Sequence, residues 1–207
     1  MAVNKCLVLG SNSQVVNPQT LDTSAPHPLI ARCVVGEDQA WRDLHREYHP
    51  VASRFLRRMG VPASELEDVC QEVFVQVIRY LGRFEQRADF RTWLYQLCLS
   101  QASRLRRRQH VQKVLDWVLG RESSAKATHG EPDWSVAMAT QRVSQALDQM
   151  KPMHRTVLVL YEFEGIEGDE IARILACPPT TVRRRLHYAR QEFEALLCAE
   201  DTERGKS

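Results

Sequence analysis

Residues 64–108 read SELEDVCQEVFVQVIRYLGRFEQRADFRTWLYQLCLSQASRLRRR and carry two amphipathic helical patterns with a short polar segment between them. In the first pattern the apolar residues recur at steps of three and four, which places them on one face of a helix. They are Leu66, Val69, Cys70, Val73, Phe74, Val77, Ile78 and Leu81. Ser64, with Glu67 three residues later, has the form of a capping box and predicts where this helix begins, and Gly82 predicts where it ends.

The second pattern begins at Phe90 and ends in a run of arginines. Its apolar residues are Phe90, Trp93, Leu94, Leu97, Cys98, Ala102 and Leu105. The polar faces of the two helices differ in charge: the first is rich in carboxylates from Glu65 to Glu72, and the second ends in Arg104 and residues 106–108. One hairpin therefore presents a face suited to a basic protein partner and another suited to nucleic acid. The alternative is that both faces are simply solvated, as charged helix faces often are.

The order of the motifs in this hairpin resembles region 2 of bacterial sigma factors, in particular the extracytoplasmic-function (ECF) group of the sigma-70 family. That region has an acidic D-x-x-Q-E-x-F helix, then R-F and a polar loop, then an F-R-T-W-L-Y segment that opens a helix ending in arginines. The matching pieces here are Asp68–Phe74, Arg83-Phe84 and Phe90–Tyr95.

Composition excludes several other classes of protein. The chain has 207 residues, 43% of them hydrophobic and 26% charged, with a net charge of +2, which is ordinary for a soluble globular protein. Its six cysteines form no C-x-x-C motif, so buried thiols are expected rather than disulfides or a zinc site. Apolar runs are too short for a membrane span or a signal-peptide core, which predicts a cytoplasmic protein without membrane insertion.

No cofactor, metal site or enzymatic activity is expected. His45 and His49 are four residues apart, but Arg46 stands where a zinc-protease helix has glutamate. The carboxylates of residues 65–72 have no histidine at the i, i+3 spacing that di-metal helices use.

The predicted fold is all-α, with two small helical domains joined by a flexible linker. Prolines and small polar residues predict a disordered N-terminal arm at residues 1–37 and a linker at 111–134. The first domain is predicted at 38–110, where Pro50 is expected to kink or divide a helix, the second at 135–199, and a tail at 200–207.

The second domain contains a short helix at Asp169–Leu175, a turn at Ala176–Pro178 and a long helix that reaches about Leu197. Arginines near the start of the long helix favour a DNA-binding helix-turn-helix, with an ordinary basic helical hairpin as the alternative. Residues 146–197 resemble sigma region 4. The family's turn glycine is replaced by Ala176, at a position that often needs a positive φ.

Together the two resemblances imply an ECF sigma factor, which binds core RNA polymerase, recognises −10 and −35 promoter elements and helps to open the strands. The implied partners are the clamp helices of the largest polymerase subunit, the flap of the second-largest, promoter DNA and an anti-sigma factor. The alternative function is a stand-alone helix-turn-helix transcription regulator.

Motif by motif, the resemblance also implies site residues. Those that match the polymerase-binding helix are Asp68, Gln71 and Glu72. The −10 candidates are Phe84, Arg87, Asp89, Arg91, Trp93, Gln96, Arg104, Arg106 and Arg107, although the spacing of Trp93 favours a place in the core. The −35 candidates are Thr180, Thr181, Arg183, Arg184, Arg185, His187 and Arg190. Residues 85–89 match the loop that captures a flipped base of the −10 element.

Overall fold

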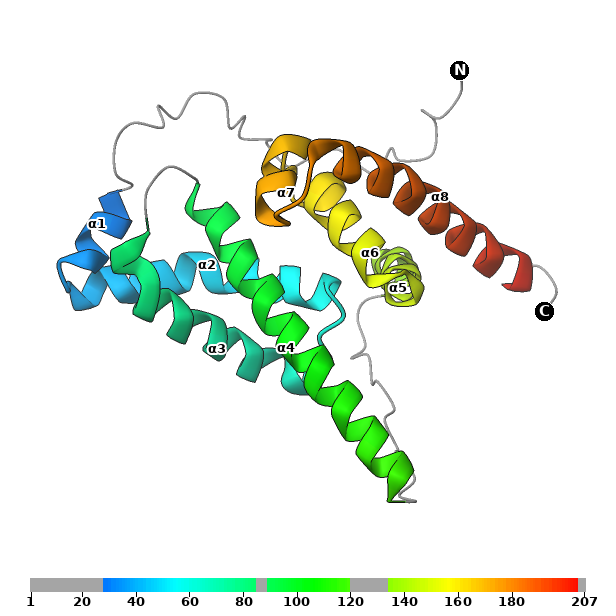
Figure 1. Cartoon of the computed structure of the whole chain (residues 1–207), viewed down its shortest axis with the longest axis horizontal. Coiled ribbons are helices and arrows are strands. Elements are labelled where there is room, and N and C mark those ends of the chain that lie inside the picture. Colours follow the sequence, from blue (N-terminus) through cyan, green and yellow to red (C-terminus); the bar gives the residue numbers. More distant parts are fainter. Residues whose placement is uncertain (1–27, 85–88, 120–133, 205–207) are drawn as a thin grey trace.

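The computed structural model describes residues 28–84, 89–119 and 134–204, and every regular element in these ranges is a helix (Figure 1). The predicted all-α fold is thus confirmed. The helices are α1 (Pro28–Val34), α2 (Asp38–Arg58), α3 (Ala63–Tyr80), the 3-10 turn η1 (Leu81–Arg83), α4 (Phe90–Val118), α5 (Trp134–Gln149), α6 (Pro152–Leu158), the π-helical η2 (Val159–Phe163), α7 (Gly168–Ile174) and α8 (Pro179–Arg204).

Helices α2, α3 and α4 pack together as the first domain. The predicted apolar stripes of α3 and α4 face α2 in a common core, where the rings of Phe55 and Tyr95 are in contact, with centroids 4.6 Å apart. Val73 and Leu94 are fully buried there. Burying each such aliphatic side chain contributes about 1.5–3 kcal/mol, so the stripes account for the packing of these three helices. None of the described helices is both long enough and apolar enough to cross a membrane.

Two local predictions in this domain were wrong. Helix α3 begins at Ala63 with Pro62 as its N-cap and has no side-chain cap hydrogen bond, because proline has no side-chain oxygen to accept from the amides of the first turn. Ser64 lies inside the first turn instead of capping it. Ile78 is 62% exposed, because it lies on the edge of the apolar stripe, where no helix covers it. Of the two outcomes predicted for Pro50, a kink or a division of the helix, the division does not occur, because α2 continues through Pro50 as one element.

The expectation of a disordered arm is wrong for residues 28–34, which form α1. Ile30 and Cys33 are one turn apart and only 1% and 2% exposed, so they anchor this helix on α2. Pro28 suits the start of a helix, because the backbone N–H that proline lacks would have no hydrogen-bond partner within the first turn. Residues 1–27 lie outside the described residues. At the other boundaries, α4 runs on to Val118 and α8 to Arg204, both past the predicted ends.

The second domain holds α5 to α8 around a core that includes Leu147, Leu160 and Ile171. Glu192 of α8 accepts hydrogen bonds from the backbone N–H of Lys151, at 3.0 Å, and from His154, which ties α8 to the start of α6. Partial burial alone would raise the pKa of the Glu192 carboxyl, but these hydrogen bonds hold it below its ordinary value. In Figure 1 this domain lies against the first, with α7 beside α4.

Candidate nucleic-acid and protein interfaces

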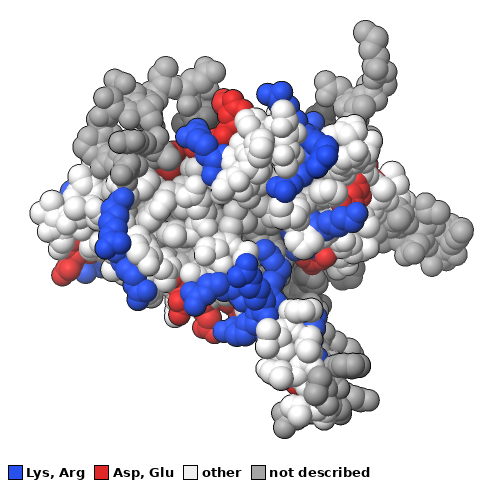
Figure 2. Space-filling view, viewed as in Figure 1, with Lys and Arg blue, Asp and Glu red and all other residues white. Residues whose placement is uncertain are grey.

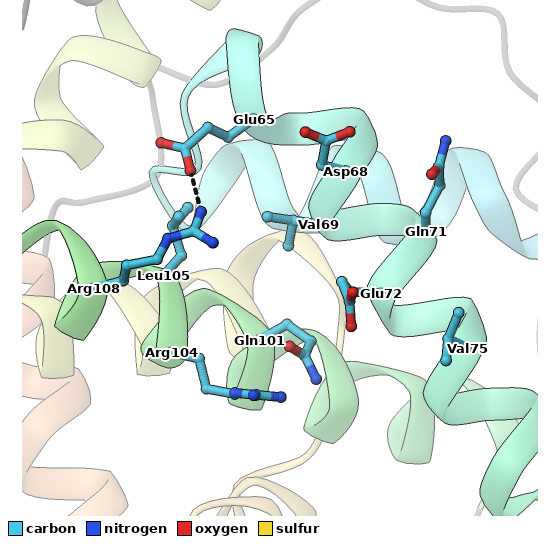
Figure 3. Close-up of a pocket in the computed structure, with 10 residues that line it drawn as sticks. All are labelled: Glu65, Asp68, Val69, Gln71, Glu72, Val75, Gln101, Arg104, Leu105 and Arg108. Atoms are coloured by element: carbon cyan, nitrogen blue, oxygen red, sulfur yellow. Dashed lines mark hydrogen bonds and ion pairs between the residues drawn. The ribbon is translucent and has the colours of Figure 1, made fainter.

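A groove runs along the surface between α3 and α4 (Figure 3). Val69 and Leu105 are buried beneath it, 7% and 5% exposed. Its walls carry charges of opposite sign, since acidic side chains come from α3 and basic ones from α4. The lining residues are Glu65, Asp68, Val69, Gln71, Glu72 and Val75 of α3, and Gln101, Arg104, Leu105 and Arg108 of α4.

Only part of the acidic charge in this groove is neutralised within the protein. Glu65 accepts hydrogen bonds from Arg108, at 2.8 Å, and from Gln109, at 2.7 Å, and so closes one end. Asp68 and Glu72 are exposed and have no ion-pair partner among the described residues. Figure 3 shows Glu72 directed toward Gln101 across the groove. Two carboxylates therefore remain available to a basic partner.

The exposed face of α3 continues beyond the carboxylates as an apolar surface that the sequence reasoning missed. Val75 is 45% exposed and Ile78 62% exposed, and both follow Gln71 at helical spacing. A polar strip that continues into exposed apolar side chains is typical of a surface that docks protein. The signal was present in the sequence, because residues 71, 75 and 78 recur at i, i+4 and i+7.

The −10 candidates divide into exposed and packed side chains. Asp89, Arg91, Gln96, Arg104 and Arg107 are exposed. Phe84 and Trp93 are half-buried and contact each other, with ring centroids 5.0 Å apart, and Phe90 lies beneath both. One face of Trp93 is thus part of the core while the side chain remains partly accessible. Arg87 lies outside the described residues.

Arg106 differs from the other arginines of α4 because it is turned inward. Its guanidinium donates to Ser103 Oγ at 3.1 Å and to the carbonyl of Met59 at 3.4 Å. Burial lowers the pKa of this guanidinium. In Figure 2 the Lys and Arg side chains gather over the middle of α4, and others lie separately over α8. On this face, the basic side chains over α4 and those over α8 are thus separate groups.

In the second domain, α7 and α8 form the predicted helix-turn-helix, joined at residues 175–178. The buried face of α8 carries Val182, Leu186 and Ala189, which hold this helix against α6 and α7. The opposite face presents Thr180, Arg183, Arg184 and His187 to solvent. An exposed, arginine-bearing first half of the second helix is the arrangement that enters the major groove of DNA.

Three other −35 candidates are either half-buried or already paired within the protein. Thr181 is half-buried, and so is Arg185, whose Nη1 lies 3.9 Å from Cys177 Sγ. Arg190 pairs with Glu162 at 2.6 Å and lies over the ring of Tyr161. The accessible basic surface of α8 therefore centres on Arg183 and Arg184. Among the residues that the structure describes, no cluster of three or more His, Cys, Asp or Glu side chains could hold a metal ion.

Comparisons with known proteins agree with this geometry. A family model described as Sigma-70 region 2 matches residues 44–111, and one described as Sigma-70, region 4 matches residues 140–193. The chain is 32% identical to the RNA polymerase sigma factor CarQ of Myxococcus xanthus, over 78% of this chain and 91% of CarQ. It is 28% identical to the ECF RNA polymerase sigma-E factor of Escherichia coli K12, over 80% of this chain and 91% of that protein. The chain belongs to the ECF group of the sigma-70 family.

The fold of this sigma factor is also found in solved structures. It is similar to the sigma factor RpoE co-crystallised with the anti-sigma factor NepR from Bartonella quintana, with a TM-score of 0.63 and 21% identity. The match covers 75% of this chain and 97% of that one. In this sigma factor, the domain of α2 to α4 is region 2 and the domain of α5 to α8 is region 4.

The turn of the region 4 helix-turn-helix contains a strained residue. Ala176 has a φ of +47°, the left-handed conformation that was predicted for this position of the turn. We expect Ala176→Gly to stabilise the protein by up to about 1 kcal/mol, because glycine adopts this conformation without the steric cost that a Cβ brings. Urea denaturation would measure the change in the free energy of unfolding.

Ala172→Gly is the matched control. Ala172 is buried in α7, and glycine in a helix interior costs about 1 kcal/mol relative to alanine. The two substitutions should therefore change stability in opposite directions. A destabilised Ala176→Gly variant would show that the turn is not strained.

Proposed function

We propose that this sigma factor binds core RNA polymerase through the exposed face of α3 and reads promoter DNA with its two separate basic surfaces. Region 2 would recognise and help to open the −10 element, and region 4 would read the −35 element. The observation that carries the proposal is the presence of three accessible charged surfaces on a sigma-70 scaffold: carboxylates on α3, and arginines on α4 and on α8. The protein would work in the cytoplasm, with the polymerase.

Asp68, Gln71 and Glu72 would form the polymerase contact with the clamp helices of the largest subunit. They lie on consecutive exposed turns of α3, and the two carboxylates have no ion-pair partner among the described residues. A basic coiled coil would supply the complementary charge, which mainly sets the specificity and rate of association. Val75 and Ile78 would add apolar contact beside them.

For the −10 element, the aromatic pair Phe84 and Trp93 offers a partly accessible stacking surface. Base–aromatic stacking is worth about 1–3 kcal/mol per base, which is comparable to the cost of extruding a base from the duplex. Arg91 and Gln96 are exposed on the first turns of α4, where they could contact a single strand. Arg104 and Arg107 would hold backbone phosphates of the adjacent duplex.

For the −35 element, the first half of α8 would enter the major groove. Arg183 and Arg184 can each pair with guanine through two hydrogen bonds, which specifies sequence. Thr180 and Thr181 would bind phosphate and fix the orientation of the helix. His187 follows on the same exposed face, whereas Arg190 would first have to leave Glu162.

Protein partners beyond the clamp helices are also proposed. The flap of the second-largest polymerase subunit would hold region 4 near the upstream DNA. An anti-sigma factor would regulate the protein, as the structure of RpoE with NepR illustrates for a protein of the same fold.

Run-off transcription with core polymerase tests the proposal directly. Core polymerase with this protein should initiate at a defined promoter, whereas core polymerase alone should not. A stand-alone helix-turn-helix regulator predicts the reverse dependence: tight, specific binding to duplex DNA without polymerase and no change in initiation by the core enzyme. That result would contradict the proposed function.

A further inference from the structure

A carboxylate of region 4 is inserted between two side chains of region 2. Glu164 accepts a hydrogen bond from Arg58 of α2 at 2.8 Å and another from the hydroxyl of Tyr95 of α4 at 2.5 Å. The Glu164 side chain is only 10% exposed, and Tyr95 is fully buried. A carboxylate at this depth would be costly without partners, so both donors contribute to the placement of region 4 on region 2.

The backbone of region 4 is shaped to present this carboxylate. The π-helical segment η2 ends immediately before Glu164, whose N–H donates to the carbonyl of Val159, five residues earlier, at 3.1 Å. Wide turns of this kind occur frequently at functional sites because they redirect the residues that follow. The ring of Phe163 lies beneath the guanidinium of Arg58, 4.9 Å from the ring centroid. Two successive residues of region 4 therefore hold the same arginine of region 2.

A second contact joins the domains at the end of α2. Arg155 of region 4 is held by the carbonyl of Leu147 and, at 3.0 Å, by Asp148. Its guanidinium lies so close to Gly60 that a Cβ at that position would clash with it. Arg106, one of the −10 candidates, is turned inward toward Met59 beside this contact. Arg106 is half-buried, and both of its hydrogen-bond acceptors, Met59 and Ser103, belong to region 2.

The arrangement in which region 4 packs against region 2, which we call closed, is too small to contact both promoter elements at once. Elements centred at −10 and −35 lie about 25 base pairs apart, or roughly 85 Å at 3.4 Å per base pair. A compact chain of 207 residues has a radius of gyration of only about 17 Å. Residues 120–133 join the two domains and could span up to about 50 Å when extended, so separation is sterically possible.

We infer that Glu164, held by Arg58 and Tyr95, is a latch that keeps the free protein closed and must release before both promoter elements can be read. The need for release before promoter recognition rests on the proposed function, whereas the latch itself is a property of the free protein. Burial, together with the hydrogen bond to Glu164, keeps the pKa of Tyr95 well above its ordinary value, so its hydroxyl remains a donor. Arg58 is one-third exposed, whereas the Glu164 side chain is only 10% exposed, so opening mainly returns the carboxylate to water.

Small-angle X-ray scattering of the full-length protein tests the latch. Glu164→Lys places a like charge beside Arg58 and should shift the closed-to-open ratio at least about tenfold, seen as a larger radius of gyration and maximum dimension. Tyr95→Phe, which removes only the hydroxyl, should shift it in the same direction by less. Adding Arg58→Glu to Glu164→Lys recreates the ion pair with reversed polarity and should restore compactness. Glu162→Lys is the matched control, because Glu162 pairs with Arg190 inside region 4.

Binding to core polymerase gives the second readout. If opening precedes full engagement, Glu164→Lys should bind core polymerase about tenfold more tightly than the wild type, and the charge-reversed double variant should return toward it. A wild-type protein already as extended as Glu164→Lys, or a Glu164→Lys variant as compact as the wild type, would overturn the latch. If no variant bound polymerase, the proposed function would fail, while the scattering would still decide whether the latch exists.

Discussion

Transcription from promoters that depend on a −35 element is expected to be lost when Arg183 and Arg184 are both replaced by alanine. Both side chains are exposed on the first half of α8 and have no ion-pair partner among the described residues. Each arginine–guanine pair is worth about 1–3 kcal/mol, so losing two should lower promoter occupancy by a factor of roughly 30 to 20,000. Run-off transcription with reconstituted holoenzyme measures the loss.

Two observations would distinguish a loss of DNA recognition from a loss of folding or of polymerase binding. Lys151→Ala removes one positive charge from the same domain, far along the chain from the helix-turn-helix turn, and should leave transcription near the wild-type level. The Arg183→Ala, Arg184→Ala variant should still bind core polymerase and unfold at the same temperature, since neither side chain is buried. Undiminished −35-dependent transcription by this variant would remove α8 from the recognition surface.

Reversal of charge at Asp68 and Glu72 is expected to give the second large effect, this time on polymerase binding. Replacing both with lysine would set two cations against a basic partner. Close charge pairs across interfaces have coupling energies of about 1.5–7 kcal/mol, so the affinity for core polymerase should fall by at least about 100-fold. Affinity measured at two salt concentrations checks the electrostatic origin, because the loss should shrink at higher ionic strength.

Glu67→Lys provides the control on the same helix. Glu67 is exposed but lies outside the lining of the α3–α4 groove, and its carboxylate is 3.4 Å from the ring nitrogen Nε2 of His49. The same change of charge there should leave polymerase affinity within a few-fold of the wild type. If Glu67→Lys weakened binding as much as the double reversal, net charge rather than the groove would determine binding. If the double reversal had no effect, polymerase would have to dock elsewhere.

The amino-acid sequence by itself determined the helices other than α1, the apolar stripes and the helix-turn-helix of this protein. Those features depend on local periodicity and turn chemistry, as the buried Cys70 and Cys98 and the positive φ of Ala176 illustrate. The charged faces of α3 and α8 could also be predicted, because exposed polar positions follow from the same 3.6-residue repeat. The motif order then identified the family to which those helices belong.

Only the tertiary structure decided which of these side chains are accessible. Arg106 and Arg104 look alike in the sequence, yet Arg106 faces Met59 while Arg104 borders the groove. Ile78 continues the predicted stripe but no helix covers it, and α1 is held by a core that lies elsewhere in the chain. Glu164 meets Tyr95 and Arg58 across 69 and 106 residues of sequence. Periodicity in the sequence shows which face of a helix is apolar. What covers that face, and which side chain pairs with a given charge, depends on how separate helices pack in space.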